Sequence, residues 1–277
     1  MALKDLLVHV DDSEAGTARV AVAIRLAQMH NAHLVGLYVM PPVEIPVFAE
    51  VRIPDEILVE QKEAARARAA KAKEAFIAAT DKADLSSEWR FIEAKPVPTL
   101  ERQGRYVDLV VVGQKDDTDP LALAGSLTEY VILDCGRPVL VIPSAGASDT
   151  VGDHVLVAWN ASRESVRAVN DALPLLKQAQ TVDLLAINPP GYIAGEGEIP
   201  SADICQHLVR HGVDAKATHL EAHDSSVGEM LLSRAADKGA DLIVMGAYGH
   251  SRVREFVLGG ATRHLLEHMT VPVLMAH

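Results

Sequence analysis

The sequence GADLIVMGAYGHSRVREFVLGGATRHLL, from Gly239 to Leu266, combines strand, glycine-loop and helix patterns in the order that suits phosphate binding. Its apolar run DLIVM is short and bounded by glycines, which is typical of a strand buried on both faces of a parallel sheet. Gly246 and Gly249 follow, and nine residues later the pair Gly259–Gly260 precedes a helical pattern beginning at Thr262. We expect the backbone amides at the start of that helix to face an anion.

The spacing of these glycines resembles the nucleotide loop of the universal stress protein family. That loop has the form Gly-x-x-Gly, nine residues, then Gly-Ser or Gly-Thr, whereas here Gly260 stands at the hydroxyl position and Thr262 follows two residues later. The departure removes one side-chain donor and leaves the backbone donors. The resemblance implies a Rossmann-like, adenine-nucleotide α-hydrolase-like fold that binds ATP or AMP, with Mg²⁺ accompanying the nucleotide. The alternative is that the glycines form only a turn and a helix cap.

An internal repeat predicts the architecture. The segment LLVHVDDS, beginning at Leu6, reappears 149 residues later as VLVAWNAS, beginning at Val155. Strands alternate with helical patterns in both copies, so we expect an α/β protein of two tandem, doubly wound, five-stranded parallel-sheet domains. The predicted domains are residues 1–146 and 147–277, joined by the small, polar segment Ser144–Thr150. Ligands of such sheets bind at the carboxyl ends of the strands, here between the first and fourth strands of each half.

Local patterns predict the individual elements. Ser13 and Ser162 are expected to cap the first helix of each half. The final strands of the two halves resemble those through which single-domain members of the family pair, so the resemblance implies that they pair with each other within this chain. The predicted strands beyond the repeat are 34–39, 88–93, 108–113, 139–142, 182–187, 214–220, 241–245 and 273–276, and the predicted helices are 18–29, 56–83, 166–178 and 202–210.

The two halves have different ligand ends. The first half has Asp11, where the family has an aspartate near the adenine and ribose, but Asp116 takes the place of the second loop glycine. Its loop is one residue shorter, and Asp117 and Asp119 add negative charge that Lys115 offsets only in part. The second half has the intact loop and carries Asn160, which can still hydrogen-bond a base or a hydroxyl. We therefore expect one nucleotide per chain, in the second half.

The expected nucleotide-binding residues lie at the ends of the first two strands and in the glycine loop of the second half. They are Ala158, Trp159, Asn160, Ile187, Met245, Gly246, Tyr248, Gly249, His250, Gly259, Gly260, Ala261 and Thr262. Core packing is the alternative for Trp159, and a solvent-facing loop position is the alternative for His250 and for Arg252.

Composition limits the partners and the compartment. A net charge of −12 argues against nucleic acid and anionic membrane surfaces as partners. Cys135 and Cys205 form no C-x-x-C motif, which fits a reducing compartment, and the N-terminal segment predicts a strand rather than a signal peptide. We expect a cytoplasmic protein in which the two halves form an intramolecular pseudo-dimer that can dimerise further.

No catalytic set and no metal site is predicted, because the sequence lacks a P-loop, a nucleophile elbow and a zinc motif. His207 and His211, spaced by four residues, could bind a divalent metal only fortuitously. The leading hypothesis is a nucleotide-responsive stress or signalling module in which slow ATP hydrolysis is at most incidental. The alternatives are an ATP-hydrolysing or adenylate-transferring enzyme, and a small-ligand or assembly protein without nucleotide.

Overall fold

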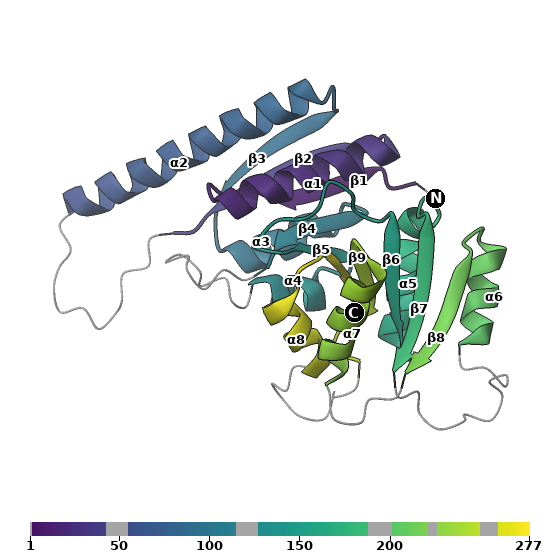
Figure 1. The fold of residues 1–277 in the computed structure, drawn as a ribbon. Coiled ribbons are helices and arrows are strands. Elements are labelled where there is room, and N and C mark those ends of the chain that lie inside the picture. Colours follow the sequence, from purple (N-terminus) through teal and green to yellow (C-terminus); the bar gives the residue numbers. More distant parts are fainter. Residues whose placement is uncertain (1, 43–54, 115–126, 188–200, 221–225, 250–259) are drawn as a thin grey trace.

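A computed structural model of the chain describes residues 2–42, 55–114, 127–187, 201–220, 226–249 and 260–277 (Figure 1). Strands and helices alternate in both halves. The first half contains β1 (Asp5–His9), α1 (Glu14–His30), β2 (His33–Met40), α2 (Asp55–Lys82), β3 (Ser87–Glu93), α3 (Pro96–Gly104), β4 (Leu109–Gly113), α4 (Leu127–Asp134) and β5 (Val139–Ile142). The second contains β6 (His154–Trp159), α5 (Arg163–Leu176), β7 (Thr181–Ile187), α6 (Ala202–Arg210), β8 (Ala215–Leu220), α7 (Val227–Lys238), β9 (Leu242–Gly246), α8 (Gly260–His268) and β10 (Val273–Ala276).

All ten of these strands form one sheet, in the order β3-β2-β1-β4-β5-β10-β9-β6-β7-β8. The order β3-β2-β1-β4-β5 of the first half is mirrored by β8-β7-β6-β9-β10 of the second, and neighbours within each half run parallel. This confirms the predicted fold class. β5 and β10 pair antiparallel, with Leu140 opposite Leu274, which confirms the predicted pairing of the final strands. Because strand direction reverses at this seam, the carboxyl ends of the two halves lie at opposite edges of the sheet.

The hydrophobic core is divided by sheet face rather than by half. One layer lies under α1, α2, α5 and α6, and the other lies under α3, α4, α7 and α8. The first layer includes Val20, Phe76, Val169 and Leu208, and the second includes Leu100, Val131, Leu231 and Leu265. Both layers therefore cross the seam and bury apolar side chains from the two halves together.

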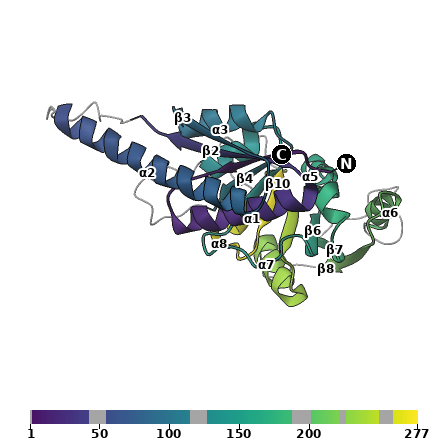
Figure 2. The ribbon, with the colours of Figure 1, turned by 90° about the horizontal axis from the view of Figure 1, so that it is seen from above.

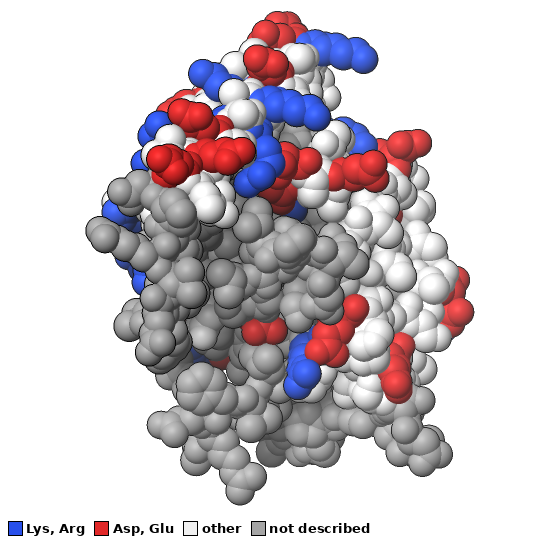
Figure 3. All heavy atoms as spheres, turned by 90° about the vertical axis from the view of Figure 1, so that its left-hand side faces the viewer, with Lys and Arg blue, Asp and Glu red and all other residues white. Residues whose placement is uncertain are grey.

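The long helix predicted at 56–83 is α2, and it extends beyond the sheet, as two perpendicular views show (Figures 1 and 2). Its last turns bury Ala69, Ala72 and Phe76, whereas its first turns are exposed. Lys62 and Arg66 pair with Glu93 at the end of β3. Basic and acidic side chains alternate over this region of the surface, as expected for a solvated helix (Figure 3).

Serine caps fix the start of the first helix in each half. The Ser13 hydroxyl accepts a hydrogen bond from the Gly16 amide, and the Ser162 hydroxyl accepts one from the Ser165 amide, so both predicted caps are confirmed. α1 consequently begins at Glu14, four residues before the predicted start. α8 likewise begins at Gly260 rather than at Thr262.

Candidate functional site

The candidate site lies at the carboxyl ends of β6 and β9, where the chain turns from strand to helix. After β6, the side-chain oxygen of Asn160 accepts a hydrogen bond from the Ser162 amide at 3.1 Å, and Ala161 has a φ of 58°. This Asx turn leads directly into the Ser162 cap of α5. Asn160 itself is exposed beside the start of the helix.

Gly246 allows α5 to approach the end of β9 closely. A Cβ atom at this position would collide with the Glu164 carbonyl carbon and the Ser165 amide nitrogen. Glycine is therefore required here because the backbone of the first turn of α5 occupies the space of a side chain. β6 and β9 are neighbouring parallel strands, so their carboxyl ends, which are followed by Asn160 and formed by Gly246, lie at the same edge of the sheet.

Hydrogen bonds hold the start of the glycine loop. The Ala247 amide donates to the Ala276 carbonyl at 2.9 Å, and the His277 Nδ1 group donates to the Ala247 carbonyl at 3.0 Å. The Tyr248 amide, at a residue with a φ of 61°, donates to the hydroxyl oxygen of Thr262 at 3.3 Å. The buried Thr262 side chain thus ties the first turn of α8 to the loop.

Two helix N-termini meet near this loop, those of α5 and α8. Ser162 caps α5, whereas Gly260 at the start of α8 is exposed and a Cβ atom there would have no neighbour within 4 Å. A Cβ atom at Gly249 would lie 3.0 Å from Glu164 Oε2 and 3.2 Å from Ser162 Oγ. Gly249 thus lies against the first turn of α5, and Tyr248 before it is hydrogen-bonded to the first turn of α8.

Glu164 is a site residue that the sequence reasoning missed. Its side chain is mostly buried, and its carboxylate lies close to Gly249. An acidic residue in the first turn of a helix is common, so that position gave no signal. The available signal was that Glu164 lies on the buried stripe of α5, four residues before Ala168. Within the described ranges, no cluster of three or more His, Cys, Asp or Glu residues could hold a metal ion.

Tyr248 connects the glycine loop with the first half. Burial, and then the negative charge of Glu129 on α4, raise the pKa of its hydroxyl above the usual range. The hydroxyl oxygen is buried and has no hydrogen-bond partner among the described residues, and the ring lies edge-on to His277 with centroids 6.2 Å apart. Tyr248 therefore packs against the core layer that α4 and α8 cover.

The other predicted site residues divide between the two core layers. Trp159 packs against the α5 layer, while Ala158, Ile187 and the buried Met245 belong to the α8 layer. Trp159 thus has the packing contacts of its alternative interpretation. Ala261 lies in the first turn of α8. His250, Arg252 and Gly259 lie outside the described residues, as do Lys115, Asp116, Asp117 and Asp119 of the first-half loop, and their roles stay predictions.

The corresponding place in the first half is filled by Arg19, a buried residue of α1 that the sequence reasoning also missed. Its Nε donates to the His9 carbonyl at 2.7 Å and its Nη2 donates to Asp11 Oδ2 at 2.5 Å. Burial disfavours the charged form of Asp11, but Arg19 and the Ser13 hydroxyl outweigh it and lower the pKa of Asp11 to about 2. Burial and Arg19 together lower the pKa of His9 to about 4.

Gln114, the residue after β4, ties the first half to the second. The Gln114 side-chain amide donates to the Leu266 and Glu267 carbonyls at the end of α8, at 3.0 and 3.2 Å. Its oxygen accepts from the Ser144 amide at 3.0 Å, and the Thr128 hydroxyl donates to the Gly113 carbonyl at 2.8 Å. The polar groups of Gln114 and the Gly113 carbonyl are therefore used in hydrogen bonds within the protein.

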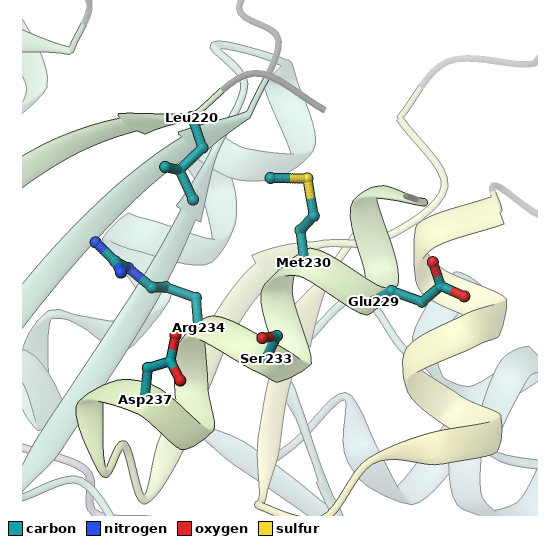
Figure 4. Close-up of a pocket in the computed structure, with 6 residues that line it drawn as sticks. All are labelled: Leu220, Glu229, Met230, Ser233, Arg234 and Asp237. Atoms are coloured by element: carbon teal, nitrogen blue, oxygen red, sulfur yellow. The ribbon is translucent and has the colours of Figure 1, made fainter. Parts of the chain in front are cut away.

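A separate hollow of about 210 Å³ lies between α7 and the end of β8 (Figure 4). It is lined by Leu220, Glu229, Met230, Ser233, Arg234 and Asp237. It is shallow, its walls come almost entirely from one helix, and none of the predicted nucleotide-binding residues lines it. The rings of His207 on α6 and His211 at its C-cap lie with centroids 4.6 Å apart and an interplanar angle of 55°, without a third metal-ligating residue among the described ones.

Comparisons with known proteins relate both halves of the chain to one family. The profile of the universal stress protein family matches residues 2–143 and 152–277. Universal stress protein Rv2005c of Mycobacterium tuberculosis (strain ATCC 25618 / H37Rv) is 25% identical over 98% of this chain and 96% of its own length. Universal stress protein Slr1230 of Synechocystis is 26% identical over 60% of this chain and 57% of its own length.

Among solved structures, a universal stress protein from Archaeoglobus fulgidus DSM 4304 superposes with a TM-score of 0.74. It is 17% identical, and the match covers 98% of this chain and 97% of that one. This likeness shows that the tandem fold recurs over the full described length. None of the helices in the described ranges is long and apolar enough to cross a membrane.

Proposed function

Because the chain belongs to the universal stress protein family, we propose that it binds one adenine nucleotide, ATP or AMP, in its second half and acts as a nucleotide-responsive stress or signalling module. The observation that carries this proposal is the open N-terminus of α8 beside Gly249. The backbone amides of a helix start favour phosphate, and a Cβ atom at Gly260, the first residue of α8, would meet nothing within 4 Å. The glycine spacing and the family membership support the same ligand.

Local dipoles must hold this anion, since the chain as a whole carries a net charge of −12. Glu164 adds a carboxylate close to Gly249, where it would repel a phosphate. A divalent cation between the two negative groups removes that repulsion, and Mg²⁺ in proteins is commonly held by one or two carboxylates together with substrate phosphates. The single nearby carboxylate of Glu164 fits that arrangement, so we propose that the nucleotide binds together with Mg²⁺.

The first half has no equivalent role in this proposal. Arg19 and Asp11 occupy the ends of β1 and β4, and Asp116, Asp117 and Asp119 are expected to repel phosphate. In this proposal the predicted domain 147–277 binds the nucleotide, and the predicted domain 1–146 has a structural role.

Retained and added nucleotide test the proposal. Mass spectrometry of the denatured, purified protein should detect an adenine nucleotide, and calorimetric titration of the stripped protein with ATP and Mg²⁺ should give a stoichiometry near one per chain. A stoichiometry near two would place a second site in the first half. No heat and no retained nucleotide would refute nucleotide binding altogether.

A charge at Gly249 should abolish binding. Gly249→Asp places a second carboxylate beside Glu164, where the phosphate is expected, and we expect the ATP affinity to fall by a factor of about 100 or more. Gly249→Ala is the matched steric control: its Cβ meets only the ends of two side chains, so its affinity should fall less. Unchanged affinity of Gly249→Asp, with its circular dichroism intact, would show that the ligand binds elsewhere.

The Mg²⁺ requirement should depend on Glu164. Glu164→Gln keeps the shape of the side chain and removes its charge, so ATP should bind this variant more tightly than wild type when EDTA is present. When Mg²⁺ is present, wild type should bind ATP as tightly as Glu164→Gln or more tightly. If EDTA weakens ATP binding equally in both proteins, Glu164 does not take part in holding the cation.

A further inference from the structure

Arg19 is an arginine buried in the first half at a point where a doubly wound sheet binds its ligand. Its side-chain hydrogen bonds to described residues lie at the carboxyl end of β1, and its guanidinium also reaches the carboxyl end of β4. Nε donates to the His9 carbonyl, Nη2 donates to Asp11, and Nη1 lies so close to Gly113 that a Cβ atom there would collide with it. The guanidinium therefore fills the gap between the two strand ends.

The repeat shows which residues accompany this arginine. At the equivalent positions, 149 residues later, the second half has Asn160 for Asp11, Ser165 for Gly16 and Ala168 for Arg19. A Cβ atom at Gly16 would collide with Asp11 Oδ1, so a side chain at this position is incompatible with the Asp11 conformation. The three residues thus act as a set: the first half has a cation, its carboxylate and the glycine that makes room for the carboxylate, and the second half has none of them.

We propose that Arg19 is a built-in occupant of the first-half ligand site, and that removing its side chain leaves a site for a free guanidinium-type cation. The comparison with an open second half rests on the proposed function, whereas the occupancy itself rests on the contacts of Arg19. The groups that line the space, the Asp11 carboxylate and the His9 carbonyl, are hydrogen-bond acceptors. A planar cation with donors on every nitrogen and no acceptor matches them, and an anionic nucleotide does not.

Chemical rescue tests this inference without any nucleotide. Arg19→Ala should unfold about 5 °C or more below wild type, since the cavity and the uncompensated Asp11 charge both destabilise the fold. Adding about 20 mM guanidinium chloride, far below denaturing concentrations, should recover part of that loss because the ion binds the folded state. The same concentration of sodium chloride should not, and neither salt should raise the midpoint of wild type.

Arg25→Ala is the matched control, because Arg25 is on the same helix and donates from Nη2 to the Ser148 carbonyl at 2.9 Å. Guanidinium should not stabilise this variant. Equal responses of the two variants, or no response of Arg19→Ala, would overturn the inference. If Arg19→Ala does not fold alone, it should fold when guanidinium is present and stay unfolded in sodium chloride; failure in both salts also overturns it.

ATP titration of Arg19→Ala separates this inference from the proposed function. The second half should bind ATP as in wild type, with an unchanged stoichiometry. Absence of ATP binding in wild type would refute the proposed function and leave the guanidinium result to decide the role of Arg19. Absence of rescue with normal ATP binding would refute the role of Arg19 alone.

Discussion

The carboxyl ends of the strands differ between the two halves, although the strands themselves follow the same order. At β1 and β4 the space is closed by the Arg19–Asp11 pair, and Gly113 lies against the guanidinium. At β6 and β9 the backbone of α5 lies against Gly246, and α8 begins with an exposed glycine. The sheet and its seam constrain a duplicated fold more strongly than its ligand ends do, because the apolar strands have partners on both sides and the loops do not.

The seam is the part that the halves share, and breaking it should have the largest effect. Leu140 and Leu274 are buried opposite each other across β5 and β10. Leu140→Ala and Leu274→Ala should each lower the free energy of unfolding by about 3 kcal/mol, as buried leucines do when truncated. The double variant should lose less than the sum, by roughly 0.5–1 kcal/mol, because the two sites are in contact.

Urea denaturation of the four proteins measures this cycle. Strict additivity would mean that the two leucines do not support each other and that the halves are joined in some other way. Two separate transitions in wild type, one for each half, would contradict a core that runs across the seam.

The sequence predicted the seam and the strands to within about one residue at most ends. Buried strands such as β5 and β10 are short, continuous apolar runs, and such runs leave little choice of boundary. The start of α1 was predicted late because Glu14–Thr17 carries no apolar periodicity, and only the Ser13 cap marks the true start. Local sequence patterns therefore predict the boundaries of uniformly buried strands well. They predict the start of a helix less well when a capping residue determines it.

The ligand ends were predicted only in part, since they depend on contacts between residues far apart in the chain. The glycine loop was visible as a spacing, but Arg19 was not, because arginine on a helix is usually solvated. Two signals were present: Arg19 shares a helical stripe with Gly16, Val20 and Ala23, and the repeat pairs it with Ala168. When a buried helical stripe carries a charged residue in one copy of a repeat and an apolar residue at the equivalent position of the other copy, that position indicates where the two copies diverge.

The glycines at the two strand ends give the next largest effect. Gly246→Ala forces its Cβ against the backbone of Glu164 and Ser165, so we expect a loss of about 3 kcal/mol. Gly113→Ala meets the end of the Arg19 side chain, which can shift at the cost of its pairing, so the loss should be about 1–2 kcal/mol. Both values come from the midpoint of urea unfolding.

Gly260→Ala is the matched control for these two variants. Its Cβ has no neighbour within 4 Å and it begins a helix, so the stability should stay the same or rise by a few tenths of a kcal/mol. Equal losses at Gly246 and Gly113 would show that α5 and α1 approach the sheet equally closely.

Exchanging Asp11 for asparagine and Asn160 for aspartate should affect stability less than the glycine substitution at Gly246, and only the change at Asp11 should be destabilising. Asp11→Asn leaves the Arg19 charge buried without its partner; because 36% of the Asp11 side chain is exposed, we expect about 2 kcal/mol rather than the larger cost of a fully buried pair. Asn160→Asp changes an exposed side chain and should alter stability by no more than about 0.5 kcal/mol. Similar losses for both variants, measured by urea unfolding, would contradict the assignment of the ion pair to the first half alone.

The smallest expected effect is a pH dependence carried by His9. Its pKa is lowered from 6.5 to about 4 by burial and by Arg19, with Asp11 acting in the opposite direction. The unfolded chain therefore binds a proton on this side chain before the folded chain does, so the stability present above pH 6.5 decreases as the pH falls toward 4. Between pH 7 and 5.5 the contribution of His9 should be about 1 kcal/mol. Burial and the charge of Lys4 also lower the pKa of His30, so His30 acts in the same direction.

Urea unfolding at pH 7 and pH 5.5 tests this. The free energy of unfolding should decrease less for His9→Asn than for wild type, and less still when His30→Asn is added. An identical decrease in wild type and His9→Asn would show that His9 can be protonated in the folded state, and hence that the Arg19 guanidinium does not hold a positive charge beside it.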